Sequence, residues 1–139
     1  MTAQRLMIVD DILQVRSDLH TLLELVGDIE IVGEAGNGEE AVLRAASLHP
    51  DVILMDLEMP LMNGYEATRR IKEQLPSCRV IALSVHSYPE ARLRACQAGV
   101  DAFIVKGEPL ASLMQEILSG SLHRRGSLYR KGASDEYHQ

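Results

Sequence analysis

Acidic residues end two short apolar segments of this chain, and each is followed at once by residues that form loops. Asp56 closes the segment Val52–Met55 and precedes the string Leu-Glu-Met-Pro-Leu-Met-Asn-Gly. The pair Asp10-Asp11 follows the apolar segment Arg5–Val9 in the same way. A carboxylate at the end of a buried strand costs stability, because burial disfavours its charged form. Its placement therefore indicates a chemical role.

Two other polar residues end apolar segments. Ser84 closes the segment Val80–Ser84, and Lys106 follows Phe103-Ile-Val. Taken singly, such a hydroxyl is expected to bond to backbone, and such a lysine to extend its ammonium into solvent. Beside a cluster of carboxylates, the two side chains instead become partners for phosphoryl oxygens, one through its charge and one through a hydrogen bond.

Carboxylates crowded into one site repel one another, and a hard divalent cation removes that cost. Mg²⁺ suits Asp10, Asp11 and Asp56 because it takes one or two carboxylates together with waters and phosphate oxygens. The set is too small for a dedicated Ca²⁺ cage, and it lacks the His and Cys ligands of zinc sites. For Asp10 and Asp11 alone, two solvated loop aspartates remain the alternative.

A nucleophilic carboxylate, a metal, a lysine and a hydroxyl form a complete set for phosphoryl transfer, which depends on positioning and charge neutralisation. The sequence has no Gly-rich phosphate loop with a following Lys-Ser/Thr, so nucleotide hydrolysis is not supported. We therefore favour Asp56 as a phosphoryl acceptor. An enzyme-class alternative is a Mg²⁺-dependent phosphohydrolase of the haloacid-dehalogenase type, with Asp56 as transient nucleophile. Glu58 has the spacing of the second acid in such enzymes, but on the third strand instead of the first.

Hydrophobic periodicity predicts the elements that position these residues. Apolar runs predict five strands, at Arg5–Val9, Ile29–Gly33, Val52–Met55, Val80–Ser84 and Ala102–Val105. Stretches of helical period lie between them and predict helices over residues 12–26, 38–48, 64–75, 89–99 and 110–118. Asp11 is the expected N-cap of the first helix, and Asn37 that of the second, with Glu40 three residues on.

The alternation of strand and helix predicts an α/β fold. Near-continuous hydrophobic strands indicate burial on both faces, hence a parallel sheet sandwiched by helices. Right-handed crossovers leave few topologies, and a five-stranded doubly wound sheet fits about 120 residues. In such sheets, ligands bind outside the carboxyl ends of the strands. All candidate residues follow strand ends, so we expect them at one edge: Asp10, Asp11, Asp56, Ser84 and Lys106.

Composition limits the broad class of the protein. A chain of 139 residues with 46% hydrophobic content suits a single domain, and the net charge of −6 argues against nonspecific binding of nucleic acid. Cys78 and Cys96 have no metal-binding or redox spacing, no apolar run is long enough for a membrane span, and no secretory signal opens the sequence. We expect a reduced, cytoplasmic protein, with a domain over 1–120 and a flexible tail over 121–139. Five basic side chains are expected on solvated helix faces: Arg69, Arg70, Lys72, Arg92 and Arg94.

The chain resembles the receiver domain of two-component response regulators over residues 5–118. The resemblance depends on Asp10-Asp11, Asp56, Met59-Pro60, Asn63-Gly64, Ser84, Phe103 and Lys106, in the family's order and at its spacings. It implies the flavodoxin-like strand order 2-1-3-4-5. It also implies a signalling protein in a histidine-kinase phosphorelay that is not an enzyme, apart from catalysing its own phosphorylation and dephosphorylation.

The resemblance implies roles for the site residues. Asp56 is the phosphoacceptor, Asp10 and Asp11 bind Mg²⁺ with it, and the backbone carbonyl of Glu58 supplies a further ligand. Ser84 and Lys106 hold the phosphoryl group.

The family's switch and its tuning positions fall on other residues of this chain. When Ser84 moves towards the phosphoryl group, Phe103 turns inward. Glu58 and His86 occupy positions that tune the lifetime of the phosphoryl group. Lys106 is followed by Gly107, where many receivers have proline and a cis peptide.

The implied partners are a sensor histidine kinase or phosphotransfer protein and an output protein. The output protein binds the face formed by the fourth helix, the fifth strand and the fifth helix. A homodimer is left open, and neither nucleic acid nor membrane is an expected partner. The strings Met59–Arg69 and Leu83–His86 are similar to receivers of the LuxR-type transcription-factor branch. The alternative is therefore the receiver part of a DNA-binding transcription factor that lacks its helix-turn-helix domain, since about twenty residues after Gly120 are too few for one.

Overall fold

Five parallel strands form one sheet in the order β2-β1-β3-β4-β5, as the resemblance implied. The computed structural model describes residues 3–119, so the tail expected over 121–139 lies outside the described residues. The strands are β1 Gln4–Val9, β2 Ile29–Ala35, β3 Val52–Asp56, β4 Arg79–Ser84 and β5 Ala102–Val105. The helices are α1 Leu13–Glu24, α2 Gly38–Leu48, α3 Gly64–Gln74, α4 Pro89–Ala98 and α5 Leu110–Leu118. The predicted doubly wound α/β fold is confirmed.

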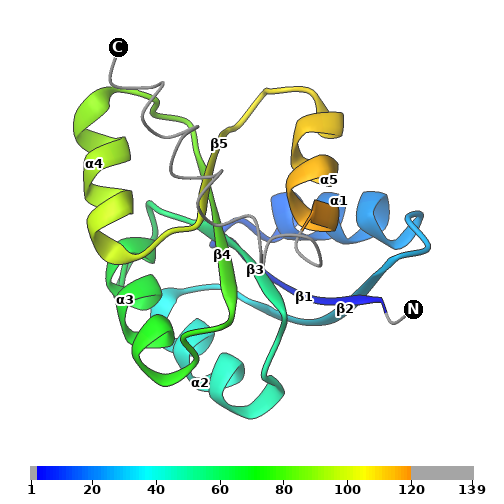
Figure 1. Cartoon of the computed structure of the whole chain (residues 1–139), viewed down its shortest axis with the longest axis horizontal. Coiled ribbons are helices and arrows are strands. Elements are labelled where there is room, and N and C mark those ends of the chain that lie inside the picture. Colours follow the sequence, from blue (N-terminus) through cyan, green and yellow to red (C-terminus); the bar gives the residue numbers. More distant parts are fainter. Residues whose placement is uncertain (1–2, 120–139) are drawn as a thin grey trace.

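Helices cover both faces of the sheet (Figure 1). Helices α1 and α5 pack on one face, where Leu23, Leu113 and Ile117 join the buried residues of β1, β3 and β4. Helices α2, α3 and α4 cover the other face, where the apolar cluster includes Ala41, Ile71 and other small or branched residues. Every residue of β3 is buried, because this central strand contacts both helical layers. None of the helices in residues 3–119 is long and apolar enough to cross a membrane.

The helix caps agree with the sequence at one predicted position and disagree at another. Asn37 caps α2 as expected, since its side chain accepts the Glu40 N–H at 2.9 Å. The prediction of Asp11 as N-cap of α1 is wrong, because the cap position is Ile12 and has no side-chain cap bond. The Ile12 N–H is instead bound by Oδ1 of Asp10 at 2.9 Å. Asp10 therefore closes the turn before α1 with its own side chain, which fixes the direction of its carboxylate.

Strand register brings the predicted residues to one edge of the sheet. Val9 pairs with Met55, so Asp10 emerges beside Asp56. On the other side of β3, Asp56 pairs with Leu83, and the Lys106 N–H donates to the Ser84 carbonyl at 2.8 Å. The edge at which parallel strands end in a doubly wound sheet is the usual place for a ligand.

Candidate functional site

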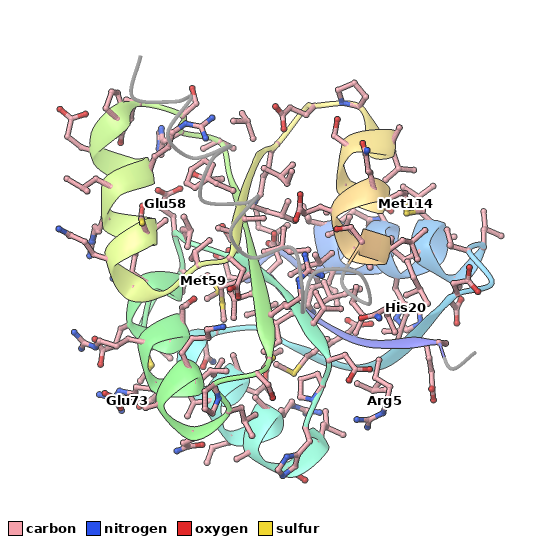
Figure 2. The ribbon with its side chains drawn as sticks, in the orientation of Figure 1. Arg5, His20, Glu58, Met59, Glu73 and Met114 are labelled. Atoms are coloured by element: carbon pink, nitrogen blue, oxygen red, sulfur yellow. The ribbon has the colours of Figure 1, made fainter. Side chains whose placement is uncertain are left out.

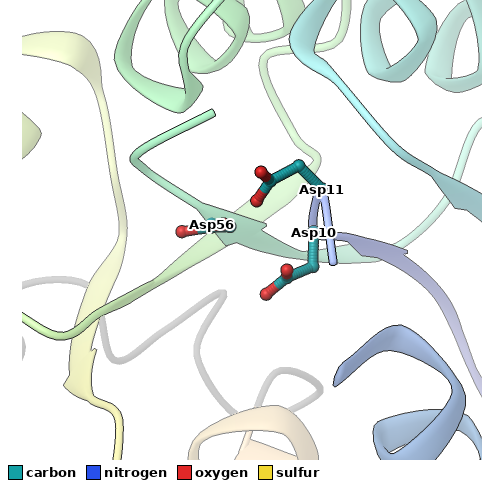
Figure 3. Close-up of side chains that lie close together, drawn as sticks. All are labelled: Asp10, Asp11 and Asp56. Atoms are coloured by element: carbon teal, nitrogen blue, oxygen red, sulfur yellow. The ribbon is translucent and has the colours of Figure 1, made fainter. Parts of the chain in front are cut away.

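Three carboxylates meet at the carboxyl ends of β1 and β3 (Figure 3). Asp10 and Asp56 are 1% and 4% exposed, whereas Asp11 is exposed. One oxygen from each of Asp10, Asp11 and Asp56 lies within 4.8 Å of the others. Three hard oxygen donors at this separation, open to solvent on the Asp11 side, fit a Mg²⁺ ion that keeps several waters. The sequence prediction that these residues converge is confirmed.

Lys106 lies between the two buried carboxylates. Its Nζ is 3.2 Å from Oδ2 of Asp10 and 3.6 Å from Oδ1 of Asp56. Burial alone lowers the pKa of the Lys106 ammonium, but the carboxylates of Asp56 and Asp10 outweigh it and raise that pKa above its usual value. The lysine is therefore a fixed positive charge beside Asp56.

The Asp56 carboxyl is held far from its ordinary titration range. Burial and the neighbouring Asp10 charge raise its pKa to about 7, against the opposing effect of Lys106 and of a hydrogen bond from the Glu58 N–H. That N–H lies 3.3 Å from Oδ1 of Asp56. A carboxyl with this pKa is ionised only in part at neutral pH, and a cation bound beside it would favour the nucleophilic, ionised form.

The backbone after Asp56 is fixed by the close approach of Gly64 to the end of β3. The Gly64 N–H donates to the Leu57 carbonyl at 3.0 Å, and a Cβ at position 64 would overlap the carbonyl oxygen of Asp56. Asn63 caps α3 by accepting the Glu66 N–H at 3.0 Å. The Asn-Gly pair therefore turns the loop back over β3 and holds the Asp56 backbone in place.

Ser84 lies at the end of β4 and is fully buried. Its Oγ accepts the His86 N–H at 3.0 Å. The His86 ring faces Glu58 across the mouth of the site, with Nε2 3.9 Å from Oε1 of Glu58 and both side chains 46% exposed. The two residues predicted to tune the site thus approach each other from the β3–α3 and β4–α4 loops.

Phe103 is half-buried and packs against the apolar cluster on the α2–α3–α4 side of the sheet. It lies on β5, three residues before Lys106, and pairs with Ala82 of β4. The Lys106–Gly107 peptide is trans, and Gly107 has φ +101°, which a glycine tolerates readily. Gly107, which stands where many receivers have proline, therefore leaves Lys106 within reach of the carboxylates.

Three arginines near the site have roles that sequence reasoning missed. Arg16 of α1 donates to the main-chain carbonyl of Asp10 at 2.6 Å. Arg92 is only partly exposed and Arg94 is exposed as expected, but the guanidinium groups of both also stack on rings, those of Phe103 and Tyr65. Helical periodicity shows that these arginines are absent from the core but not which neighbouring ring they cover.

The β3–α3 loop, whose Glu58 and Met59 are labelled in Figure 2, also borders a shallow hollow next to α4. Glu58 and Met59 line it from the loop, and Arg94 lines it from α4. Its lining starts at Leu57, the residue directly after Asp56, so the hollow lies next to the carboxylate cluster in the chain.

Comparisons with known proteins agree with this geometry. The family model for the response regulator receiver domain matches residues 6–118. The response regulator protein VraR of Staphylococcus aureus is 43% identical over 102 residues, which are 73% of this chain and 49% of that protein. The chain spans about half the length of the curated relatives it matches.

Two solved structures are similar in both fold and sequence. A LuxR-family two-component response regulator from Aurantimonas has a TM-score of 0.81 at 31% identity, with 85% of this chain and 84% of that chain covered. The CheX–CheY–BeF3–Mg complex from Borrelia burgdorferi has a TM-score of 0.77 at 28% identity, with 85% and 89% covered. This chain belongs to the response regulator receiver domain family of two-component signalling.

Proposed function

We propose that this receiver stores a signal as a phosphoryl group on Asp56, accepted with Mg²⁺ from a phosphohistidine donor. The observation that carries the proposal is the position of Asp56, a buried carboxylate beside Asp10 and Asp11 with the Lys106 ammonium 3.6 Å away. A nucleophile, a metal set and a fixed cation at one strand end are the groups that phosphoryl transfer needs.

In the transfer step, an Oδ of Asp56 forms a bond to phosphorus while the bond from phosphorus to the donor nitrogen breaks. The electron pair of that bond leaves with the imidazole of the donor. Asp10, Asp11, Asp56 and the carbonyl of Glu58 would hold Mg²⁺, which when bound neutralises phosphoryl charge. Lys106 holds a phosphoryl oxygen through its charge, and the Ser84 hydroxyl donates to another.

The phosphoryl group then drives a conformational change, because it adds nearly two negative charges and three acceptor oxygens. The Ser84 Oγ now accepts the His86 N–H at 3.0 Å, so movement of Ser84 towards the phosphoryl group alters the β4–α4 loop as well. The volume that Ser84 leaves lets Phe103 turn inward. Moving the equilibrium from about 1:99 to 99:1 takes roughly 5.5 kcal/mol. Two charge-assisted hydrogen bonds of up to about 3 kcal/mol each approach that amount.

Glu58 and His86 set how long the phosphoryl group persists. They lie 3.9 Å apart across the mouth of the site, where a hydrolytic water would approach Asp56. We propose that the pair restricts this approach. As a member of the receiver family, the chain is not a classical enzyme, and its proposed catalysis is confined to its own phosphorylation and dephosphorylation. Membership of the receiver family, with Glu58 on the third strand's loop, makes the phosphohydrolase alternative the weaker one.

Apolar side chains surround the proposed site. The loops and helix starts at the carboxyl edge of the sheet expose six large ones: Ile12, Leu13, Leu61, Val85, Tyr88 and Leu110. Exposed apolar groups gathered around a reactive centre favour protein contact there. This rim supports a protein phosphodonor, such as a sensor histidine kinase or phosphotransfer protein.

The α4–β5–α5 face is proposed to bind the output protein, because Phe103 on β5 links the site to that face. The similar structure from Borrelia burgdorferi contains CheX and CheY together with BeF3 and Mg, which supports partner binding by an activated receiver. Homodimerisation, cytoplasmic location and the absence of nucleic-acid or membrane binding stay predictions. Because the curated relatives are about twice as long, a DNA-binding output within a longer protein stays an alternative.

Phosphorylation can be tested directly by intact mass. With Mg²⁺ and a small donor such as acetyl phosphate, the parent is expected to gain the mass of one phosphoryl group. Asp56→Asn is expected to gain none, and Asp28→Asn, a change of an exposed aspartate elsewhere, is expected to behave like the parent. The proposal fails if the parent gains nothing or if Asp56→Asn gains one phosphoryl group.

A further inference from the structure

Arg92 connects three parts of the molecule that the proposed switch must move. Its guanidinium carbon lies 4.6 Å from the centroid of the Phe103 ring on β5. Its Nε donates to the Ser87 carbonyl of the β4–α4 loop at 3.2 Å. Arg92 itself lies in the first turns of α4. One side chain therefore contacts the proposed switch ring and the loop that follows Ser84.

The loop contact leads back to the site in two short steps. Ser87 is next to His86, whose N–H donates to the Ser84 Oγ at 3.0 Å. The Ser84 carbonyl in turn accepts the Lys106 N–H at 2.8 Å. Movement of Ser84 towards a phosphoryl group would therefore pull on the loop segment to which Arg92 is bonded.

The stack on Phe103 has a direct energetic consequence for ring rotation. A guanidinium over an aromatic face is attracted by the negative potential of the ring. Phe103 turns away from its present position only if this stack breaks or Arg92 moves with the ring. Phenylalanine has no hydroxyl, so the ring face is the part of Phe103 that a polar group on α4 holds.

Arg94 offers an internal comparison. It lies two residues further along α4, and its guanidinium carbon is 4.1 Å from the Tyr65 ring centroid on α3. The two arginines thus hold α4 on opposite sides, one to β5 and one to α3. Only the Arg92 stack involves the ring that the switch rotates.

We propose that Arg92 is a positioning residue that latches Phe103 and the β4–α4 loop in the unphosphorylated arrangement. The proposal rests on the proposed function and adds to it the group that opposes activation. In this proposal the stack breaks when the ring turns, so removing it shifts the equilibrium towards the activated arrangement. Arg92→Ala is therefore expected to bind beryllofluoride, a phosphoryl mimic, more tightly than the parent by a factor of about 2 to 30, the range that one cation–ring stack supplies.

Phe103 is the sole phenylalanine of the chain, which makes a clean spectroscopic test possible. Protein labelled with 4-fluorophenylalanine gives one ¹⁹F resonance that reports the environment of this ring. The resonance is followed during titration with beryllofluoride in the presence of Mg²⁺. In the parent, we expect it to move between two positions. In Arg92→Ala, we expect the starting resonance to lie already towards the bound position, with a lower midpoint.

Matched variants separate the latch from a general loosening of α4. Arg94→Ala removes the same charge and also a ring stack, and it is expected to titrate like the parent. Arg92→Gln serves as a second variant if Arg92→Ala unfolds, and thermal unfolding of each variant checks the fold. The latch is overturned if Arg92→Ala and Arg92→Gln titrate like the parent, or if Arg94→Ala changes as much as they do. If the parent resonance fails to move although the parent gains a phosphoryl group by mass, the ring rotation and the latch are overturned; if the parent gains no phosphoryl group, the proposed function itself fails.

Discussion

The Lys106 ammonium lies 3.2 Å from Oδ2 of Asp10, although 96 positions separate the two residues in the chain. The pair joins the ends of β1 and β5, which are not neighbours in the sheet. Lys106 reaches across β3 and β4, so its charge lies above Asp56, which it neutralises in part. The contact makes the stability of this receiver depend on the charge state of its own site.

Lys106→Met tests that dependence, because methionine keeps the length of the side chain and removes its charge. Without Mg²⁺, Asp10 and Asp56 would then face each other with no cation between them. We expect the free energy of unfolding at pH 8 to fall by about 1–3 kcal/mol, less than for a fully buried pair because Lys106 is 26% exposed. Denaturant unfolding in EDTA and in MgCl₂ checks this, and Mg²⁺ should stabilise the variant more than the parent. An unchanged unfolding midpoint in EDTA would contradict the prediction.

Asp56→Asn is expected to stabilise the metal-free protein at alkaline pH. The pKa of Asp56 is raised from 3.8 to about 7 in the folded state. Between these two values the folded protein retains a proton that the unfolded chain has released, so stability falls as pH rises through this window. Asparagine has no such proton to lose. At pH 8 in EDTA the variant should be more stable than the parent by on the order of 1–3 kcal/mol, with a smaller difference at pH 5.

The measurement for Asp56→Asn is the free energy of unfolding of both proteins at several pH values. Saturating Mg²⁺ should reduce the advantage of the variant, because the cation stabilises the ionised carboxylate of the parent. Parallel pH curves for the two proteins would rule out a strongly raised Asp56 pKa.

Asp11→Asn should weaken Mg²⁺ binding with little effect on the fold, because Asp11 is exposed while one of its oxygens lies within 4.8 Å of one oxygen each of Asp10 and Asp56. A ligand at one hundred times its dissociation constant stabilises a protein by about 2.7 kcal/mol, so the parent's melting temperature should rise with MgCl₂. The rise should be much smaller in Asp11→Asn and unchanged in Asp28→Asn, which alters another exposed aspartate. Equal rises in all three proteins would exclude Asp11 from the site.

The sequence predicts the strands and the convergence of the site because both follow from simple patterns. Buried parallel strands are runs of apolar residues, and polar residues after such runs must meet at one edge of the sheet. Asp10, Asp56, Ser84 and Lys106 were found in this way. The resemblance supplied the strand order and the roles.

Contacts between side chains could not be predicted from those patterns. The turn before α1 depends on which of two adjacent aspartates accepts the Ile12 N–H. Asp10 accepts it, and Asp11 does not. The stack of Arg92 on Phe103 depends on the distance between α4 and β5, which packing across the whole sheet sets. An arginine on a helix has the same sequence pattern whether it meets water or a ring, because its long side chain reaches either.

Gly64→Ala is expected to destabilise the fold by about 1–3 kcal/mol, because a Cβ there would overlap the Asp56 carbonyl and the Cα of Leu57. The overlap is with backbone, which cannot rotate away, so the β3–α3 loop must shift and carry Asp56 with it. Denaturant unfolding and Mg²⁺ titration should both report the change. Gly27→Ala is the matched control, since a Cβ at position 27 would have nothing within 4 Å. Equal stability of the two variants would show that the loop yields without cost.

His20→Gln should remove a pH-dependent contribution to stability on the α1–β2 side of the molecule (Figure 2). The Nδ1 of His20 lies 2.6 Å from Oε2 of Glu34, and Glu24 approaches Nε2 at 3.2 Å. The hydrogen bond to Glu34 raises the pKa of His20 against the opposing effect of burial, with Glu24 adding to the rise. Because the pKa of His20 is raised in the folded state, its contact contributes its full stabilisation below the unfolded pKa of 6.5. That contribution is lost as pH rises through the folded pKa. We therefore expect the parent to be more stable than the variant at pH 5.5, by at most about 1 kcal/mol because the pair is part-exposed. The free energies of unfolding of the two proteins should converge near pH 8.5.

Unfolding free energies of parent and His20→Gln at these two pH values isolate His20, because the two proteins differ at no other position. Glu34→Gln removes the negative charge of the partner while keeping an acceptor oxygen, and it should also flatten the pH dependence. Glu34 also accepts from Arg16 at 3.1 Å, and Arg16 holds the Asp10 carbonyl, so Glu34→Gln should in addition weaken Mg²⁺ binding whereas His20→Gln should not. If His20→Gln kept the parent's pH dependence, the contact with Glu34 would carry no charge coupling in solution.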